Sequence, residues 1–271
     1  MRRSNIETIE VSRWGDELAQ RIALGEVDAE FVIGVLEPMA TENRRHRLQQ
    51  VFADRLDSVT VVVDSLYDPH NVAALLRTSE ALGVARIHLV ATEAVSLALA
   101  GVACGTHKWV EVQSHTDAAA CVRSLRAAGM KLVAAHPQGD MMPEDLRSVP
   151  RLALVLGNEH QGIGAELSNA CDGVVRVPMR GLAESLNVSV SGGILLSYAV
   201  AGRPGDLSSL EQRRLYARGL AVSVPNAAAI LDRAFDDART RDAATDAAAD
   251  ATIDGPNGGP NDAVGGAAAG L

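Results

Sequence analysis

Three polar segments of this chain carry residue types that can bind phosphate, position a hydroxyl group and hold a small molecule through backbone groups. The first segment, residues 64–78, contains Asn71 at the start of a helical pattern and Arg77 six residues later. We expect Asn71 to cap this helix, because asparagine is a preferred N-cap residue. Arg77 could then reach back toward the helix N-terminus, where free N–H groups favour anions. The alternative is a simple cap beside a surface arginine, which the apolar neighbours of Arg77 make less favourable.

The second segment, residues 156–163, follows an apolar run and places Glu159 between two glycines. Gly157 and Gly162 allow another stretch of backbone to approach closely, as a backbone-lined binding site requires. Glycine turns after strands are common, so this segment alone is weak evidence for a site.

The third segment, residues 177–189, begins where a strand pattern stops at Pro178. Ser185 or Asn187 is suited to cap the long apolar helix that follows. A loop with a helix cap is the alternative interpretation of this segment as well.

Several common catalytic motifs are absent from the sequence. It contains no P-loop, no H-E-x-x-H pair, no C-x-x-C pair and no G-x-S-x-G elbow, which disfavours nucleotide hydrolysis, zinc proteolysis and elbow-type serine hydrolysis. Cys104 and His107 form a single C-x-x-H without a second ligand pair, so we predict no metal. The odd number of cysteines, 3, fits a reducing compartment better than a disulfide framework.

The elements that must position these segments alternate between strands and helices. This alternation predicts an α/β fold with a mostly parallel sheet and helices on both of its faces. Ligands of such sheets bind outside the carboxyl ends of the strands, which is where the three segments begin. The predicted strands cover 59–64, 86–90, 131–135, 152–156 and 174–177, and the predicted helices cover 71–82, 116–128, 187–200, 207–219 and 225–236.

Three regions are expected along the chain. Residues 1–40 form a short helical extension, and residues 41–236 form the main domain, which starts with a basic amphipathic helix over 42–56. Residues 237–271 consist mainly of Ala, Gly and Asp without an apolar period, and we expect a disordered acidic tail there.

Composition and charge narrow the class of protein. Hydrophobic residues make up 47% of the 271 residues and aromatic ones 3%, so the core must be aliphatic. No stretch approaches the roughly 20 apolar residues of a membrane span, and no signal peptide is evident, so we expect a cytoplasmic protein. The net charge of −9 arises from the two ends of the chain, and residues 41–231 carry equal numbers of basic and acidic side chains. A neutral body with local arginine clusters can still bind RNA.

Taken together, the three segments resemble the three signature motifs of the SPOUT superfamily of RNA methyltransferases, in its 2′-O-methylating branch. The matching patterns, in chain order, are N-x-x-A-x-x-R-T, G-x-E-x-x-G-I and V-P-M-x-G-x-x-x-S-L-N-V-S. The sequence His107-Lys108-Trp109-Val110 and the arginine-rich helix ahead of the first strand are also similar to that family. The resemblance covers about residues 42–235.

This resemblance implies a C-terminal trefoil knot, S-adenosylmethionine as cofactor, and a homodimer whose active site borrows from both subunits, with helix 187–200 at the interface. It implies methyl transfer to the ribose 2′-hydroxyl of a guanosine in tRNA, at position 18 of the D-loop. By the same likeness the catalytic residues are Arg77, Asn71, Glu159, Ser185 and Asn187, the cofactor-binding residues are Ala135, Leu156, Gly157, Val177, Met179, Leu186 and Ser189, and the RNA-binding residues are Arg44, Arg45, Arg47 and Lys108.

The role of Arg77 needs one qualification from chemistry. The family proposal makes this arginine the base, yet arginine is effectively never deprotonated in proteins. Our hypothesis is that Arg77 binds the adjacent phosphate and stabilises the developing alkoxide, and that the base is another group.

Other functions compete with this interpretation. A ribosomal RNA target is the nearest alternative. Relatives acting on that RNA often carry a separate N-terminal RNA-binding domain, and residues 1–40 of this chain are too few and too acidic to form one. A non-catalytic RNA-binding module with the same fold, and a small-molecule-binding α/β protein that does not bind RNA, are the others. Methyl transfer to tRNA and salt-dependent tRNA affinity would distinguish them.

Overall fold

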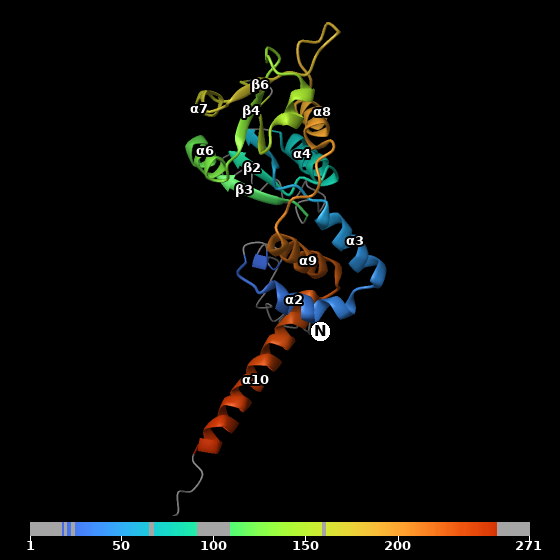
Figure 1. Ribbon diagram of the computed structural model, residues 1–271, viewed down its shortest axis with the longest axis vertical. Helices are drawn as coiled ribbons and strands as arrows, with labels where there is room; N and C mark the ends of the chain where they lie inside the picture. Colours follow the sequence, from blue (N-terminus) through green and yellow to red (C-terminus); the bar gives the residue numbers. More distant parts are fainter. Residues whose placement is uncertain are drawn as a thin grey trace, which may run out of the picture.

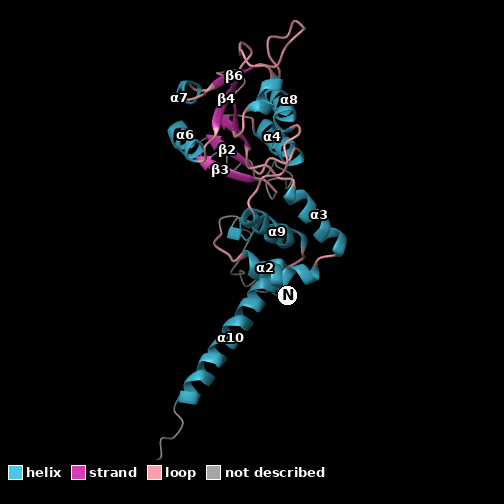
Figure 2. Ribbon diagram, in the orientation of Figure 1, coloured by secondary structure: helices cyan, strands magenta, loops and turns pink. Residues whose placement is uncertain are grey.

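A parallel sheet and a group of helices at one end of it make up the protein (Figures 1 and 2). The computed structural model describes residues 18, 21–22, 25–64, 68–90, 109–158 and 161–253. Within these residues the sheet has 6 strands in the order β3-β2-β1-β5-β4-β6, and every neighbouring pair is parallel. The strands are β1 (Val59–Asp64), β2 (Arg86–Val90), β3 (Glu111–His115), β4 (Lys131–Ala135), β5 (Leu152–Leu156) and β6 (Gly173–Val175).

Helices cover both faces of the sheet, which confirms the predicted α/β class. One face packs against α4 (Pro69–Ala81), α8 (Val188–Val200) and the 3-10 helix η3 (Pro143–Ser148). The other face packs against α6 (Ala118–Ala127) and α7 (Ala165–Asn169). All residues of β1 and β5 are buried, as the continuous apolar runs VTVVVD and LALVL predict for central parallel strands.

The prediction missed strand β3. Its sequence, EVQSH, contains one apolar residue, and none of its residues is fully buried. β3 lies at the edge of the sheet, where only one neighbour pairs with it, so it needs no apolar run.

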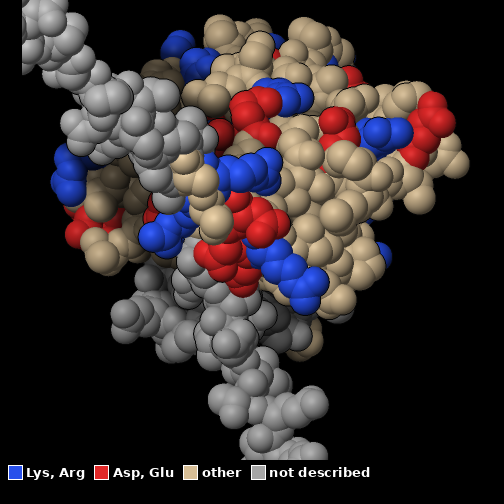
Figure 3. All heavy atoms as spheres, turned by 90° about the horizontal axis from the view of Figure 1, so that it is seen from below, with Lys and Arg blue, Asp and Glu red and all other residues tan. Residues whose placement is uncertain are grey.

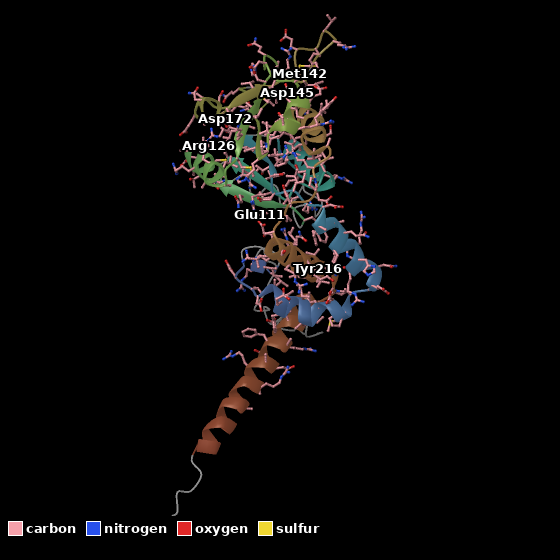
Figure 4. The ribbon with its side chains drawn as sticks, viewed as in Figure 1. Glu111, Arg126, Met142, Asp145, Asp172 and Tyr216 are labelled. Atoms are coloured by element: carbon pink, nitrogen blue, oxygen red, sulfur yellow. The ribbon has the colours of Figure 1, made fainter. Side chains whose placement is uncertain are left out.

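The helical part lies at the amino ends of the strands. It contains α2 (Ala29–Leu36), the 3-10 helix η1 (Glu37–Met39), α3 (Glu42–Ala53), α9 (Ser209–Ser223) and α10 (Ala227–Ile253). These helices share a hydrophobic core that includes Ile22, Leu36, Phe52, Leu220 and Leu231, each at most 3% exposed. The boundary predicted after residue 40 therefore does not separate two units, because α2 packs against α9 and α10. Tyr216 of α9 (Figure 4) also donates a hydrogen bond of 2.7 Å from its hydroxyl to Glu37 Oε1.

The structure also differs from the predicted tail. The segment from 237 to 253 is the outer part of α10, which projects away from the body (Figure 1), and residues 254–271 lie outside the described residues. The absence of a periodic apolar pattern over 237–253 means that this segment cannot form a packed core, but it does not prevent a helix. Alanine is the best helix former, and helical hydrogen bonds join residues that are close in sequence. Burial of Ala227 and Leu231 in the helical core fixes the start of α10, from which the helix continues.

β6 is held on both of its edges. Val175 pairs with Ala135 of β4 on one side and forms an isolated parallel bridge with Met141 on the other. The chain between Ala135 and Met141 therefore passes from one edge of β6 to the other. Asp172, directly before β6, receives two hydrogen bonds from Arg126, at 2.7 and 2.9 Å, and one of 2.8 Å from Leu132 N (Figure 4). The trefoil knot itself stays a prediction.

None of the described helices combines the length and the apolar character needed to cross a bilayer.

Candidate active site

The second and third predicted segments meet, together with Ala135, around a cavity of about 480 Å³ at the carboxyl ends of β4, β5 and β6, whereas no described residue of the first segment, 64–78, lines it. This volume is within the range of small-molecule sites. Six of the seven predicted cofactor residues line it, and so do Ser185 and Asn187 from the predicted catalytic set. The six are Ala135, Leu156, Gly157, Val177, Met179 and Leu186.

The turn after β5 forms one wall of the cavity. Asn158 and Gly162 pair through two backbone hydrogen bonds of 3.0 Å, and Asn158 Oδ1 accepts a third bond of 2.6 Å from Gln161 N. A Cβ atom on Gly157 would lie 2.2 Å from the carbonyl carbon of Gly162. Only glycine fits at position 157, so the close backbone approach expected from the sequence is confirmed. Glu159, predicted to be catalytic, lies outside the described residues.

Asn187 fixes the N-terminus of α8 beside the cavity. Its Oδ1 accepts hydrogen bonds from Ser189 N at 2.9 Å and from Ser189 Oγ at 2.6 Å, so Asn187 is the helix cap and Ser185 is not. Its Nδ2 donates a bond of 3.0 Å to Asn71 Oδ1 on α4. The side chain of Asn187 therefore joins the first and third predicted segments. Ser189 is turned to this cap and does not line the cavity.

Asn71 does not cap α4, contrary to the prediction. The cap is Asp68, whose Oδ1 accepts a hydrogen bond of 2.9 Å from His70 N. Pro69 occupies the first helical position, where its fixed φ is favourable and no N–H is needed, so α4 begins earlier than expected. Asn71 lies within the first turn of α4, and its side chain is available to Asn187.

Arg77 lies on the outer face of α4 and does not line the cavity of its own chain. Val72, Leu75, Leu76 and Ser79 form the buried face of this helix, and Arg77 belongs to the opposite, exposed face. Apolar neighbours in sequence therefore do not imply burial, because consecutive helical residues point about 100° apart. No hydrogen bond or ion pair joins its guanidinium to the part of the chain that the structure describes.

The predicted RNA-binding arginines on α3 differ in their surroundings. Arg44 Nε donates a hydrogen bond of 2.8 Å to Ser223 Oγ, and its guanidinium carbon lies 5.6 Å from the ring centre of Trp109. Arg44 therefore joins α3 to its neighbours, whereas Arg47 is exposed and Arg45 is half-buried. Lys108 lies outside the described residues. On the face in Figure 3, basic and acidic side chains lie next to one another.

Sequence reasoning missed several residues that line the cavity. His136 and Pro137 follow β4, Asn158 follows β5, and Glu184 precedes the cap of α8. Each lies within two residues of a predicted site residue, and for His136, Pro137 and Asn158 the position after a strand end was the signal available. Ser191 and Leu195 line the cavity from α8, and no sequence signal distinguished them from its other residues.

Comparison with known proteins identifies the family of this chain. Residues 58–197 match the model of the SpoU rRNA Methylase family. This chain belongs to the SpoU methylase family. It is 33% identical over 159 residues to a tRNA (guanosine(18)-2'-O)-methyltransferase of Thermus thermophilus, an alignment that covers 58% of this chain and 81% of the relative. It is also 33% identical over 168 residues to a 23S rRNA (guanosine-2'-O-)-methyltransferase of Xanthomonas axonopodis, which covers 60% of this chain and 66% of that protein.

A solved structure supports the same assignment. The TrmH/SpoU tRNA modifying enzyme of A. aeolicus superposes with a TM-score of 0.60 at 28% sequence identity, over 68% of this chain and 98% of that one. The predicted superfamily and fold class are therefore confirmed, and the chain is a methyltransferase of this family.

Proposed function

We propose that this SpoU methylase transfers a methyl group from S-adenosylmethionine to the ribose 2′-hydroxyl of a guanosine in tRNA, at position 18. The observation that carries the proposal is the cavity at the carboxyl ends of β4, β5 and β6. Residues 135–137, the turn after β5 and the segment that leads into α8 line it. The last two carry the second and third motifs that resemble the 2′-O-methylating branch, and Asn71 of the first motif is hydrogen-bonded to Asn187 at the cavity. The tRNA relative of Thermus thermophilus supports guanosine 18 as the target.

The residues around the cavity suit the cofactor. Leu156, Val177, Leu186 and Leu195 offer apolar surface for an adenine ring. Ala135 and Gly157 line the cavity and offer backbone groups that can pair with its polar edge, and Glu184 lines it as well and carries a carboxylate that can complement a sulfonium charge. S-adenosylmethionine, when bound here, supplies the methyl group on a sulfonium that is already a good leaving group.

The protein must align the ribose oxygen and assist its deprotonation. Ser185 and Asn187 lie at the cavity and can hydrogen-bond the ribose, with Asn187 held in place by Asn71. A guanidinium is a poor general base, so we assign Arg77 to binding the neighbouring phosphate and stabilising the developing alkoxide. Glu159 is assigned to the same group of positioning residues on the basis of the motif alone.

The exposed position of Arg77 favours an active site shared between two chains. His70, Ala74, Arg77 and Ala81 form an exposed stripe on one side of α4, and no described element covers this stripe. The small side chains beside Arg77 allow a second copy of the chain to approach closely. We therefore propose a homodimer in which each chain supplies the cofactor cavity of one site and Arg77 of the other, and a cytoplasmic location with tRNA as the partner.

Ribosomal RNA is the second candidate substrate, because the relative of Xanthomonas axonopodis acts on 23S rRNA guanosine according to its name. The deciding experiment is mass mapping of ribose methylation after incubation of the purified protein with S-adenosylmethionine and either unmodified tRNA or 23S rRNA. We expect one new 2′-O-methylguanosine at position 18 of tRNA. Methylation of rRNA alone would favour the second candidate, and methylation of neither RNA would contradict both.

A further inference from the structure

A second group of reactive side chains lies away from the cavity, on the sheet face covered by α6. His88 is in the middle of β2, His115 ends β3, and Cys121 is in the first half of α6. His88 and Cys121 are buried and His115 is half-buried. None of the three lines the cavity described above.

The nitrogen and sulfur atoms of this group are close to one another. His88 Nδ1 and His115 Nε2 are 2.9 Å apart, and these atoms and Cys121 Sγ all lie within 4.8 Å of each other. The imidazole rings are nearly parallel, at 13°. The thiol of Cys121 makes no hydrogen bond within the described part of the chain, whereas the other described thiol, Cys171, donates to Leu167 O at 3.3 Å. Within the described residues, the buried Cys121 thiol thus makes no hydrogen bond and lies beside two imidazoles.

The electrostatic surroundings keep both imidazoles neutral. Burial, together with the neighbouring His115 and Arg86, lowers the pKa of His88 to about 3, and burial also lowers the pKa of His115. A neutral imidazole has a free nitrogen lone pair, which is the form that binds metal ions. No carboxylate forms a salt bridge with either ring among the described residues.

We propose that His88, His115 and Cys121 form a site for one Zn²⁺ ion, with solvent as the fourth ligand. Mixed histidine and cysteine ligands in tetrahedral geometry are preferred by zinc. Zinc bonds of roughly 2.0–2.3 Å place such ligand atoms about 3.3 to 3.6 Å apart. Side-chain rotations that change the present separations by about one ångström or less would therefore bring the three ligand atoms to zinc-binding distances. On binding, the thiol releases one proton to solvent. The imidazole whose proton lies between the two rings gives it up there and takes one up, through solvent, on its other ring nitrogen, so that each imidazole coordinates through the facing nitrogen and stays neutral.

The linear spacing of these residues explains why the sequence predicted no metal. They come from three elements, and the sheet register brings them together. β2 and β3 flank the connection of residues 91–110, and β3 is an edge strand with one neighbour. The ion would hold this edge strand and α6 onto β2, and its role would be to stabilise the fold rather than to take part in methyl transfer.

The test uses the untagged full-length chain, purified without chelator. We expect one zinc ion per chain by elemental analysis after dialysis, and a melting temperature that rises when Zn²⁺ is added to the metal-free protein. Co²⁺ should give tetrahedral d–d bands and a thiolate-to-cobalt charge-transfer band. Cys121→Ser should abolish the charge-transfer band, and the matched control Cys171→Ser should keep it.

His115→Asn provides a second variant, because His115 is half-buried and its replacement disturbs the core less than a change at Cys121. We expect its affinity for Zn²⁺ to fall at least about tenfold, with the melting temperature of the metal-free protein nearly unchanged. A chain that binds neither ion, or a charge-transfer band that survives Cys121→Ser, would overturn the proposal. In that case the three residues are a hydrogen-bonded histidine pair beside an inert buried thiol.

Discussion

The proposed active site has a cofactor side, which residues of one chain form, and a substrate side, to which one chain contributes only some of the residues. Several segments form the walls of the cavity at the carboxyl ends of β4, β5 and β6, and backbone pairing at Asn158 and Val175 fixes its turns. Arg77, in contrast, lies on an exposed helix face without a partner among the described residues. Under the proposed function, we therefore expect cofactor binding to require one folded chain and methyl transfer to require RNA and Arg77 of a second copy.

Replacing Arg77 should produce the largest effect and leave the cofactor side intact. We expect Arg77→Ala to lower the rate of tRNA methylation by about 100- to 1000-fold, the cost typical of losing a charged group that stabilises a developing oxyanion. The dissociation constant of S-adenosylmethionine, measured by calorimetry, should change less than about twofold because Arg77 does not line the cavity. Arg77→Lys keeps the charge and loses the bidentate fork, and turnover equal to that of the unmodified chain would eliminate a bidentate phosphate contact.

A mutation on the opposite side sharpens the comparison. Gly157→Ala puts a Cβ atom 2.2 Å from the carbonyl carbon of Gly162, so the turn must move. Overpacking of this kind costs about 1–3 kcal/mol, and we expect cofactor affinity to weaken about 10- to 100-fold. Gly34→Ala is the matched control, because a Cβ atom there meets nothing within 4 Å. Equal cofactor affinity of Gly157→Ala and Gly34→Ala would show that this turn does not form the cofactor wall.

Mixing the two variants tests the shared site directly. When Arg77→Ala and Gly157→Ala chains are unfolded together and refolded, random pairing gives heterodimers with one intact site each, and activity of about a quarter of the unmodified level is expected. If each chain acts alone, no activity returns.

Asn187 joins the two sides, so its replacement should have a moderate effect on both. Asn187→Ala removes the cap of α8 and the hydrogen bond to Asn71. Loss of an N-cap costs about 1 kcal/mol, which urea unfolding followed by circular dichroism can measure. Asn71→Ala leaves the cap of α8 in place and should destabilise less. A larger loss for Asn71→Ala than for Asn187→Ala would contradict the assignment of the cap.

The smallest effect is expected at Asp172, which supports the cavity from below β6. Hydrogen bonding from Arg126 lowers the pKa of this carboxyl below its ordinary value of 3.8. Its contribution to the free energy of unfolding is therefore present above about pH 4 and is lost as the pH falls through the lowered pKa. Because the pair is partly exposed, we expect Asp172→Asn to cost at most about 1 kcal/mol at pH 7. The difference between the variant and the unmodified chain should shrink on acidification, and a constant difference down to pH 2 would contradict this account.

The sequence by itself determined the α/β class, the central strands and the position of the cavity. Continuous apolar runs such as residues 59–64 and 152–156 can be buried only inside a covered parallel sheet, and polar segments that follow strands must meet at one edge. The sequence also predicted the role of Gly157, because a close approach of backbone at that position leaves no room for a side chain.

Tertiary structure alone decided the rest. It placed Arg77 outside, because burial depends on which side of α4 a neighbour covers and not on the residues adjacent in sequence. It added β3 through pairing with β2, joined α2 to α9 and α10, and brought His88, His115 and Cys121 together from three elements. These features depend on contacts between residues far apart in the chain, which local patterns of hydrophobicity and spacing do not encode.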